Sequence, residues 1–179
     1  MVVSRTFDIL DRLNQEFPKE DILAGKQNGK WVTYSTKEYA QYADYVSYGL
    51  LSMGYKRGDK IATIANNRPE WNFVDMGMAQ IGIVHVPIYP TISEEDYRYI
   101  LKHSEVNGVL ISNKHIYKKI QSIVKRNRKI RDIFAFDQVE GIRSWVEIIE
   151  AGRNHEKDYR QQVREIREDI DPDEMVTLI

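Results

Sequence analysis

The stretch from Lys60 to Tyr89, KIATIANNRPEWNFVDMGMAQIGIVHVPIY, decides the fold class. It begins and ends with a short run of almost continuous apolar residues, which is typical of a strand covered on both faces. Two similar runs follow, GVLIS from Gly108 and DIFAF from Asp132, so the four runs start 23, 25 and 24 residues apart. Repeating strand–helix–strand units need right-handed crossovers. The sequence therefore predicts an α/β fold, with a mainly parallel sheet and helices on both of its faces.

Residues that start helices lie in the gaps between these runs. Ser93 with Asp96 three residues later fits a capping box, Asn113 fits a cap, and Pro69 fits a first helical turn. For the segment NNRPEW two readings stay open. Asn66, Asn67 and Arg68 could bind a polar ligand, or Asn67 could simply cap the helix that Pro69 begins, with Trp71 packed inward.

The N-terminal part predicts a helix and a short hairpin. Apolar residues from Phe7 to Phe17 recur at helical spacing until Pro18 ends them. Two short strands then surround Asn28-Gly29, a pair that favours a type I′ turn. Ser35 and Glu38 fit a second capping box. The helix that follows has one apolar face and ends at a glycine; its marker residues are Tyr39, Tyr42, Ala43, Val46, Leu50, Met53 and Gly54.

The last forty residues change in character. Residues 144–151 can form a short helix, and residues 153–174 are dense in charge with a thin apolar stripe, as expected of a solvated surface helix. MVTLI, Met175 to Ile179, then resembles the start of a further sheet strand. Because domains seldom end within a strand, we expect this chain to be part of a larger protein.

Composition narrows the functional classes. The chain has 179 residues, a net charge of −1 and no cysteine, so disulfides, thiolate metal sites and a cysteine nucleophile are excluded. The N-terminus has no uninterrupted apolar region of the kind found in secretory signals, and no run approaches the ~20 apolar residues of a membrane span. We expect a soluble, cytoplasmic protein.

The usual reactive centres are missing from the loops that follow the four strands. NNRPEW contains no glycine, and none of the ten glycines forms Gly-x-Gly, so no dinucleotide or Walker phosphate loop is present. The four histidines lie on separate elements, which argues against a zinc site or a Ser-His-Asp relay. We expect His85 to be buried and hydrogen-bonded within the sheet or at its edge. This reading assigns no catalytic, cofactor-binding or metal-binding residue.

One segment is strongly basic. Residues 113–131 hold eight Lys or Arg and no acid, with isoleucines at helical spacing. A solvated helix face is the simpler reading, and a stand-alone module that binds nucleic acid or anionic lipid is the alternative. A third reading, a stand-alone flavodoxin-like nucleotide binder, is disfavoured because no glycine-rich strand–helix loop is present.

Three blocks of the sequence, read in order, are similar to those of a known enzyme family. The first is WVTYSTKEYAQYADYVSYGLLSMGYKRGDKIATIANNRPEW, and the second is MAQIGIVHVPIYPTISEEDYRYILKHSE. The last, DPDEMVTLI, is similar to the strand that precedes the family's phosphate-binding loop. Together these blocks resemble the N-terminal part of the acyl-adenylate-forming enzymes, and in particular the long-chain fatty acid–CoA ligases. In the second block, Val86-Pro87-Ile88-Tyr89 followed by Thr91 and Ser93 favours the long-chain branch.

The resemblance implies that the parent enzyme joins a fatty acid to CoA, using ATP and Mg²⁺, through an acyl-adenylate, and that this chain is inactive alone. It implies no catalytic residue here and no nucleic-acid partner. A homodimer and a peripheral association with the inner membrane surface are left open. Residues 1–179 would form an N-terminal subdomain: helix and hairpin to residue 35, a βα core at 36–143, a charged helical connector at 144–174, and a strand at 175–179 leading to the phosphate loop.

Overall fold

The computed structural model describes residues 3–27 and 29–179. Five strands form one parallel sheet in the order β4-β3-β5-β6-β7, and two more form an antiparallel hairpin. The strands are β1 (Leu23–Gln27), β2 (Lys30–Tyr34), β3 (Lys60–Ile64), β4 (Val84–Ile88), β5 (Gly108–Ile111), β6 (Asp132–Ala135) and β7 (Arg143–Ser144). The predicted α/β class and the four predicted strands are confirmed.

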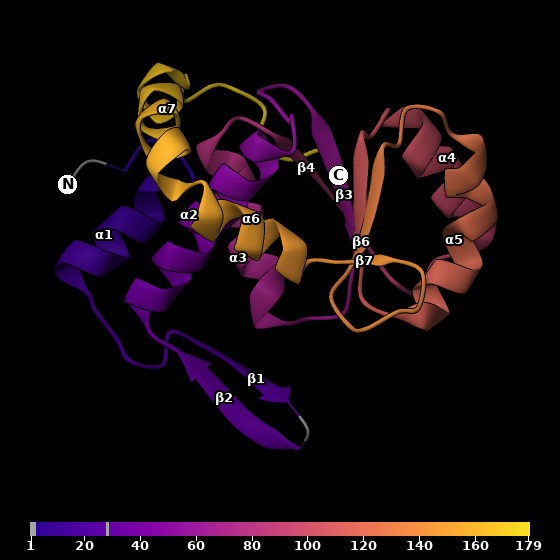
Figure 1. The fold of residues 1–179 in the computed structure, drawn as a ribbon, viewed down its shortest axis with the longest axis horizontal. Helices are drawn as coiled ribbons and strands as arrows, with labels where there is room; N and C mark the ends of the chain where they lie inside the picture. Colours follow the sequence, from indigo (N-terminus) through magenta and orange to yellow (C-terminus); the bar gives the residue numbers. More distant parts are fainter. Residues whose placement is uncertain (1–2, 28) are drawn as a thin grey trace.

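Helices cover both faces of the sheet, as predicted (Figure 1). They are α1 (Asp8–Glu16), α2 (Thr36–Ser52), α3 (Pro69–Gln80), α4 (Glu94–His103), α5 (Lys114–Arg126), α6 (Val146–Asn154) and α7 (Glu156–Asp169). One core lies between the sheet and the layer of α2, α3 and α6. A second core lies between the opposite face and α4 with α5. In the described residues no helix is long and apolar enough to cross a bilayer.

Capping residues in the sequence determine where several of these helices begin or end. Both capping boxes form: the Ser35 and Ser93 hydroxyls accept from the backbone N–H groups of Glu38 and Asp96. The Asn113 side chain accepts two backbone N–H groups at the start of α5. At the end of α2, Gly54 has a φ of +80°, which a residue with a side chain rarely adopts. These local predictions hold because each depends on neighbouring residues alone.

Helix α2 packs closely against α3 and α6. A Cβ on Gly49 would lie 2.0 Å from the carbonyl oxygen of Ile148, and one on Gly152 would lie 1.9 Å from that of Tyr45. The glycines thus allow the backbones of α2 and α6 to approach at two points. Ser47 also donates a 2.8 Å hydrogen bond to the carbonyl of Gly77 in α3. One side of α2 is therefore buried between helices as well as against the sheet.

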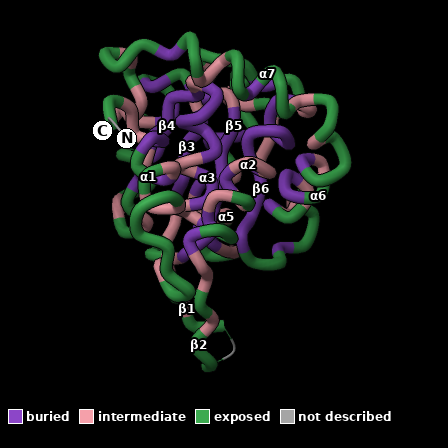
Figure 2. Tube along the Cα trace, turned by 90° about the vertical axis from the view of Figure 1, so that its left-hand side faces the viewer, coloured by how far each residue is buried: buried purple, intermediate pink, exposed green. Residues whose placement is uncertain are grey.

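The hairpin β1–β2 projects from the body of the molecule (Figure 2). Its strands pair antiparallel, with Leu23 opposite Tyr34 and Gln27 opposite Lys30. Asn28 of the predicted type I′ turn lies outside the described residues, whereas Gly29 has a φ of +78°. The hairpin root packs on α3, where a Cβ on Gly25 would lie 2.7 Å from Pro69 Cδ. Near the turn, Trp31 is 68% exposed.

The C-terminal part differs from the prediction in two places. The helix expected over residues 144–151 begins two residues later, because Arg143 and Ser144 first form β7 beside β6. The strand expected over residues 175–179 is only a bridge: Thr177 pairs parallel with His85 of β4. The bridge has two hydrogen bonds, from the His85 N–H to the Val176 carbonyl and from the Leu178 N–H to the His85 carbonyl. The charged helix α7 is largely exposed, as expected.

Candidate functional site

The carboxyl edge of the sheet contains a topological switch point between β3 and β5. After β3 the chain turns to α3 on one face, and after β5 it turns to α5 on the opposite face. In open α/β sheets, the crevice between two such diverging loops is where ligands bind. The loops here are residues 65–68 and 112–113, and the backbone N–H of Asn66 donates a 2.9 Å hydrogen bond to Ser112 Oγ between them.

A polar hollow of about 220 Å³ lies at this switch point. The hairpin overhangs it and supplies Lys26 and Gln27, while the loops after β3, β5 and β6 supply the other polar groups. The lining residues are Gly25, Lys26, Gln27, Asn66, Asn67, Arg68, Pro69, Glu70, Ser112, Asn113 and Asp137. Five of them come from the segment NNRPEW, for which a polar ligand was one of two readings.

Arg68 is the central charged group of the polar hollow. Its guanidinium contacts both carboxylate oxygens of Glu70, at 2.9 and 3.1 Å, and Asp137 Oδ1 at 2.9 Å. It also lies 4.8 Å from the centre of the Phe136 ring. Burial disfavours the charge of Arg68, but the bonds to Glu70 and Asp137 outweigh this, and its pKa is raised above the ordinary value. The Arg68 guanidinium is therefore already paired with two carboxylates.

The polar hollow is not a phosphate site by itself. The loops after β3 and β5, residues 65–68 and 112–113, contain no glycine, and Gly141, the positive-φ glycine in the loop after β6, is not among the lining residues. Tightly packed backbone N–H groups, which cradle a phosphate, depend on such glycines. Within residues 3–27 and 29–179 no three His, Asp or Glu side chains gather as a metal site would require.

A larger apolar hollow of about 500 Å³ adjoins the polar one at the ends of β3 and β4. Asn66 and Asn67 line both hollows. The other lining residues are Ala65, Trp71, Pro87, Ile88, Tyr89, Pro90, Thr91 and Ile179. Tyr89 is 79% exposed there, and its carbonyl accepts a hydrogen bond from the Tyr97 hydroxyl. This edge therefore offers an apolar surface next to a charged one.

The predicted cap at Asn67 is wrong. Arg68 holds the N-cap position of α3, with an extended backbone and no side-chain cap bond, and Asn67 is exposed. Pro69 does begin the helix, because its fixed φ suits the first turn and its missing N–H needs no partner. Trp71 is half-buried: it packs inward as predicted, yet it also forms a wall of the apolar hollow.

A buried chain of hydrogen bonds fixes Trp71. Its indole N–H donates to Thr63 Oγ1 at 2.9 Å, and Thr63 Oγ1 lies 2.7 Å from His85 Nε2. His85 Nδ1 lies 2.6 Å from Asp75 Oδ1. His85 is thus buried and hydrogen-bonded in the sheet, as predicted. Sequence reasoning missed its partners, since Thr63, Asp75 and His85 come from three separate elements.

This chain of side chains is structural rather than nucleophilic. Thr63 is 1% exposed, so no substrate reaches its hydroxyl, and its oxygen already accepts from Trp71. Trp71 and His85 also lie with ring centres 5.0 Å apart. The carboxylate, imidazole and hydroxyl therefore hold Trp71 in place at the edge of the apolar hollow.

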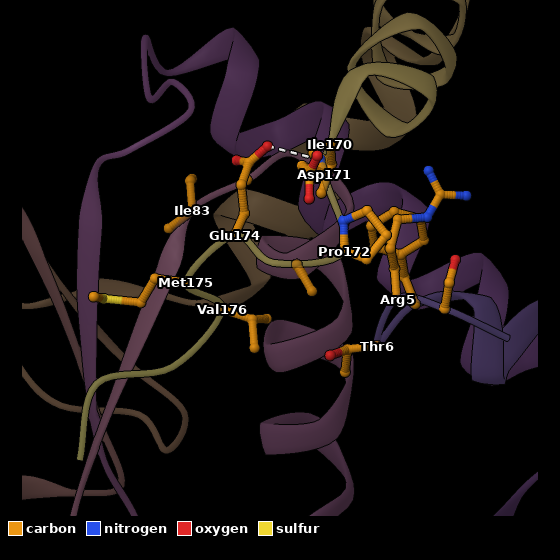
Figure 3. A pocket seen from close by; sticks show the side chains of 13 residues that line it. Arg5, Thr6, Ile83, Ile170, Asp171, Pro172, Glu174, Met175 and Val176 are labelled. Atoms are coloured by element: carbon orange, nitrogen blue, oxygen red, sulfur yellow. Dashed lines mark hydrogen bonds between the residues drawn. The ribbon is translucent and has the colours of Figure 1, made fainter.

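A third, smaller hollow of about 80 Å³ lies away from the carboxyl edge (Figure 3). It is enclosed by the segment before α1 and the segment after α7, with Arg5 and Thr6 on one side and Glu174 to Val176 on the other. Asp171 donates its backbone N–H to Glu174 beside it. Arg57 closes the outside by pairing with Asp169 and Glu174. This hollow lies between the N-terminal and C-terminal segments, and among the described residues that line it no set of reactive side chains points to one spot.

Comparison with known proteins adds an independent line of observation. The family model described as AMP-binding enzyme matches residues 10–179. Fatty acyl-CoA synthetase A of Dictyostelium discoideum is 29% identical over 123 residues, which is 64% of this chain and 18% of that protein. A long-chain-fatty-acid–CoA ligase of Mycobacterium bovis is 35% identical over 78 residues, which is 44% of this chain and 13% of the ligase. The chain thus spans less than a fifth of these relatives.

Solved structures share the fold. A putative long-chain-fatty-acid CoA ligase from Rhodopseudomonas palustris superposes with a TM-score of 0.70 over 80% of this chain and 36% of that chain, at 18% identity. Such low identity supports the fold alone. The match of the family model is different in kind, because it extends from α1 through the bridge at Thr177. This chain belongs to the AMP-binding enzyme family.

Proposed function

We propose that this chain is the N-terminal portion of an AMP-forming long-chain fatty acid–CoA ligase. The parent enzyme would join the carboxylate of a fatty acid to the α-phosphate of ATP, with release of pyrophosphate. The thiol of CoA would then displace AMP from the acyl-adenylate. Fatty acid, ATP and CoA are the substrates, and Mg²⁺ would stabilise charge on the phosphates.

The observation that carries this proposal is the family match over residues 10–179, in a chain similar to fatty acyl-CoA synthetases. Two features of the carboxyl edge of the sheet also support the proposal. Arg68, the half-buried cation of this edge, is held by two carboxylates, and the loops after β3 and β5 contain no glycine. We therefore place the groups that act on ATP in other segments of the parent enzyme, and expect no catalysis from this chain alone.

The role of this chain would be to build one wall of the site. Arg68 ties the loop after β3 to the loop after β6, and the apolar hollow beside Trp71 and Tyr89 can receive an apolar group. As a division of the chain we propose a helix and hairpin at 1–35, a βα core at 36–143, a helical connector at 144–174, and a segment at 175–179, bridged to β4 at Thr177, that leads to the phosphate loop.

The proposal also covers the compartment, the membrane association and the oligomeric state of the parent enzyme. We assign the parent enzyme to the cytoplasm. Peripheral association with a membrane surface is expected, because a long acyl chain partitions strongly into bilayers and the enzyme must collect it there. A homodimer is the proposed assembly, and it is to be measured on the parent enzyme by light scattering.

The proposal is tested by calorimetry and by pyrophosphate release. Titration of this chain with ATP and Mg²⁺ is expected to give no binding heat. The parent enzyme should release pyrophosphate from ATP only when a long-chain fatty acid is present. Turnover of ATP by this chain alone, or a parent enzyme that uses no fatty acid, would contradict the proposal.

A further inference from the structure

Helix α5 carries apolar and basic side chains on opposite sides. Its isoleucines and Val124 are buried in the core beneath the sheet. Six cations of α5 and of residues 127–129 just after it are exposed, and one of them, Lys129, pairs with Glu105. We call the other five the α5 basic face: Lys114, Lys118, Lys125, Arg126 and Arg128. In Figure 1, α5 lies on the outer side of the sheet, opposite the layer of α2, α3 and α6.

The α5 basic face has no acidic partners in the part of the chain that the structure describes. Within the described residues none of its five cations forms an ion pair or a side-chain hydrogen bond. Elsewhere in the described residues both kinds of cation occur: Arg57, Arg143 and Arg167 each contact a carboxylate, whereas Lys37 and Lys157 do not. Residues 113–131 contain no acid, so these charges have no counter-ion within their own segment.

Helix stability explains only part of this charge. Lys125 and Arg126 lie in the last turn of α5, where cations favour the helix dipole. Lys114 and Lys118 lie near the first turn, where a cation opposes the dipole, and they are four residues apart, where like charges repel. The N-terminal half of the α5 basic face therefore costs stability, and a bound anionic surface would offset that cost.

The basic surface continues onto α4. The side chain of Asn127, at the end of α5, donates a 3.4 Å hydrogen bond to the carbonyl of Leu101 in α4. The two helices thus end side by side, with the exposed Lys102 and His103 next to the last turn of α5. Lys102 and His103 thus extend the α5 basic face at this end, whereas the first turn of α4 carries Glu94, Glu95 and Asp96.

We propose that the α5 basic face docks this protein on the surface of an anionic lipid bilayer, an inference that rests on the proposed function. A bilayer is where a long-chain fatty acid accumulates, so docking there brings the enzyme to its substrate. The apolar side of α5 is already buried, so the contact is electrostatic adsorption without insertion. Nucleic acid fits less well, since Tyr117, the aromatic residue of α5, packs on the core and cannot stack on a base.

The expected strength of membrane binding follows from the number of cations on the α5 basic face. Each Lys or Arg close to an anionic membrane strengthens binding by roughly fivefold. Reversing two of the five charges should therefore weaken binding by at least about twentyfold. Because ions in solution screen these contacts, binding should also fall steeply as salt is added.

The test is co-sedimentation of the purified chain with vesicles. The lipids are phosphatidylcholine alone or phosphatidylcholine mixed with phosphatidylglycerol, at low and at near-physiological salt. The test variant is Lys118→Glu with Lys125→Glu, and the control is Lys37→Glu with Lys157→Glu. The control pair lies on α2 and α7, is equally exposed, and changes the net charge by the same amount. Circular dichroism confirms that both variants fold.

We expect the wild-type chain and the control to bind the mixed vesicles but not pure phosphatidylcholine, and the test variant to lose at least about twentyfold in binding. Absence of binding to the mixed vesicles, an equal loss in the control, or tighter binding to a single-stranded RNA would overturn the proposal. Pyrophosphate release by the parent enzyme is a separate readout. If the parent enzyme uses a fatty acid but this chain does not bind vesicles, only the docking proposal is rejected. If this chain binds the vesicles but the parent enzyme uses no fatty acid, only the ligase proposal is rejected.

Discussion

His85 Nδ1 lies 2.6 Å from Asp75 Oδ1, which joins the middle of β4 to helix α3. The Asp75 carboxylate only accepts hydrogen bonds, so Nδ1 carries the proton. With Nδ1 as the protonated nitrogen of the ring, Nε2 accepts from the Thr63 hydroxyl, which itself accepts the indole N–H of Trp71. Each donor in this chain then has one acceptor, which explains how Thr63 and His85 are tolerated within the sheet.

Thr63→Val tests this chain of hydrogen bonds. The substitution keeps the shape of the side chain but leaves His85 Nε2 and the indole N–H of Trp71 without partners. We expect a loss of about 1–3 kcal/mol in the free energy of unfolding, measured with urea. Thr33→Val, at an exposed position on β2, is the matched control and should change stability by less than about 0.5 kcal/mol. Equal effects of the two substitutions would show that the buried chain does not stabilise the fold.

Asp44 should make stability depend on pH. Burial raises the pKa of this carboxyl from 3.8 to about 6, although Arg167 opposes the shift. The folded chain therefore binds more protons than the unfolded chain between these values, and the contribution of Asp44 to stability falls as the pH rises from about 4 to about 6. Its full cost is present above that window and absent below it.

Asp44→Asn removes this charge but keeps an acceptor oxygen for Gln80, with which Asp44 forms a hydrogen bond. We expect the variant to be more stable than the wild type by about 1–3 kcal/mol near pH 7, and nearly equal to it near pH 4. Urea unfolding at the two pH values measures this. A variant that is destabilised equally at both would contradict the inferred ionisation.

Gly152→Ala should be destabilising, even though alanine is the better helix former. The added Cβ would lie 1.9 Å from the Tyr45 carbonyl, so α6 must move away from α2. We expect a loss of about 1–3 kcal/mol, measured by chemical denaturation. The exposed position Gln162 in α7 gives the comparison, since Gln162→Ala should be neutral within about 0.5 kcal/mol. A Gly152→Ala protein as stable as the wild type would disprove the close approach of the two helices.

Arg57→Ala should loosen the segment that follows α7. Arg57 pairs with Asp169 and Glu174, and it holds residues 170–178 near the bridge to β4. Its loss should speed amide hydrogen exchange at Leu178 and His85, the two donors of that bridge, by about tenfold. The control is Arg153→Ala, on α6. Unchanged exchange at both amides in Arg57→Ala would show that the bridge forms without the ion pairs.

The sequence was most informative where structure depends on near neighbours. Alternating apolar runs and gaps predicted the sheet, and Ser35, Ser93 and Asn113 predicted helix starts, because a cap bonds only to residues two or three positions away. The prediction that Asn67 caps α3 was wrong because either Asn67 or Arg68 could occupy the N-cap position, and residue type alone does not show which of them does.

The remaining features depend on distant pairs. Arg57 meets Glu174 across 117 positions, and Arg68 meets Asp137 across 69. No local pattern marks such partners. The two-residue strand β7 was missed for a related reason: Arg143 and Ser144 are not apolar, and they form a strand only because β6 has a free edge. Gly49 and Gly152 likewise look like poor helix residues until the backbone of the neighbouring helix is placed.

The most direct test of the assignment is pyrophosphate release by the parent enzyme that contains this chain, with ATP, Mg²⁺ and fatty acids of increasing length. We predict release that depends on a long-chain fatty acid, followed by formation of acyl-CoA when CoA is added, and no release by residues 1–179 alone. A parent enzyme that releases no pyrophosphate with any long-chain fatty acid, or prefers a short or aromatic acid, would contradict the assignment as a long-chain fatty acid–CoA ligase.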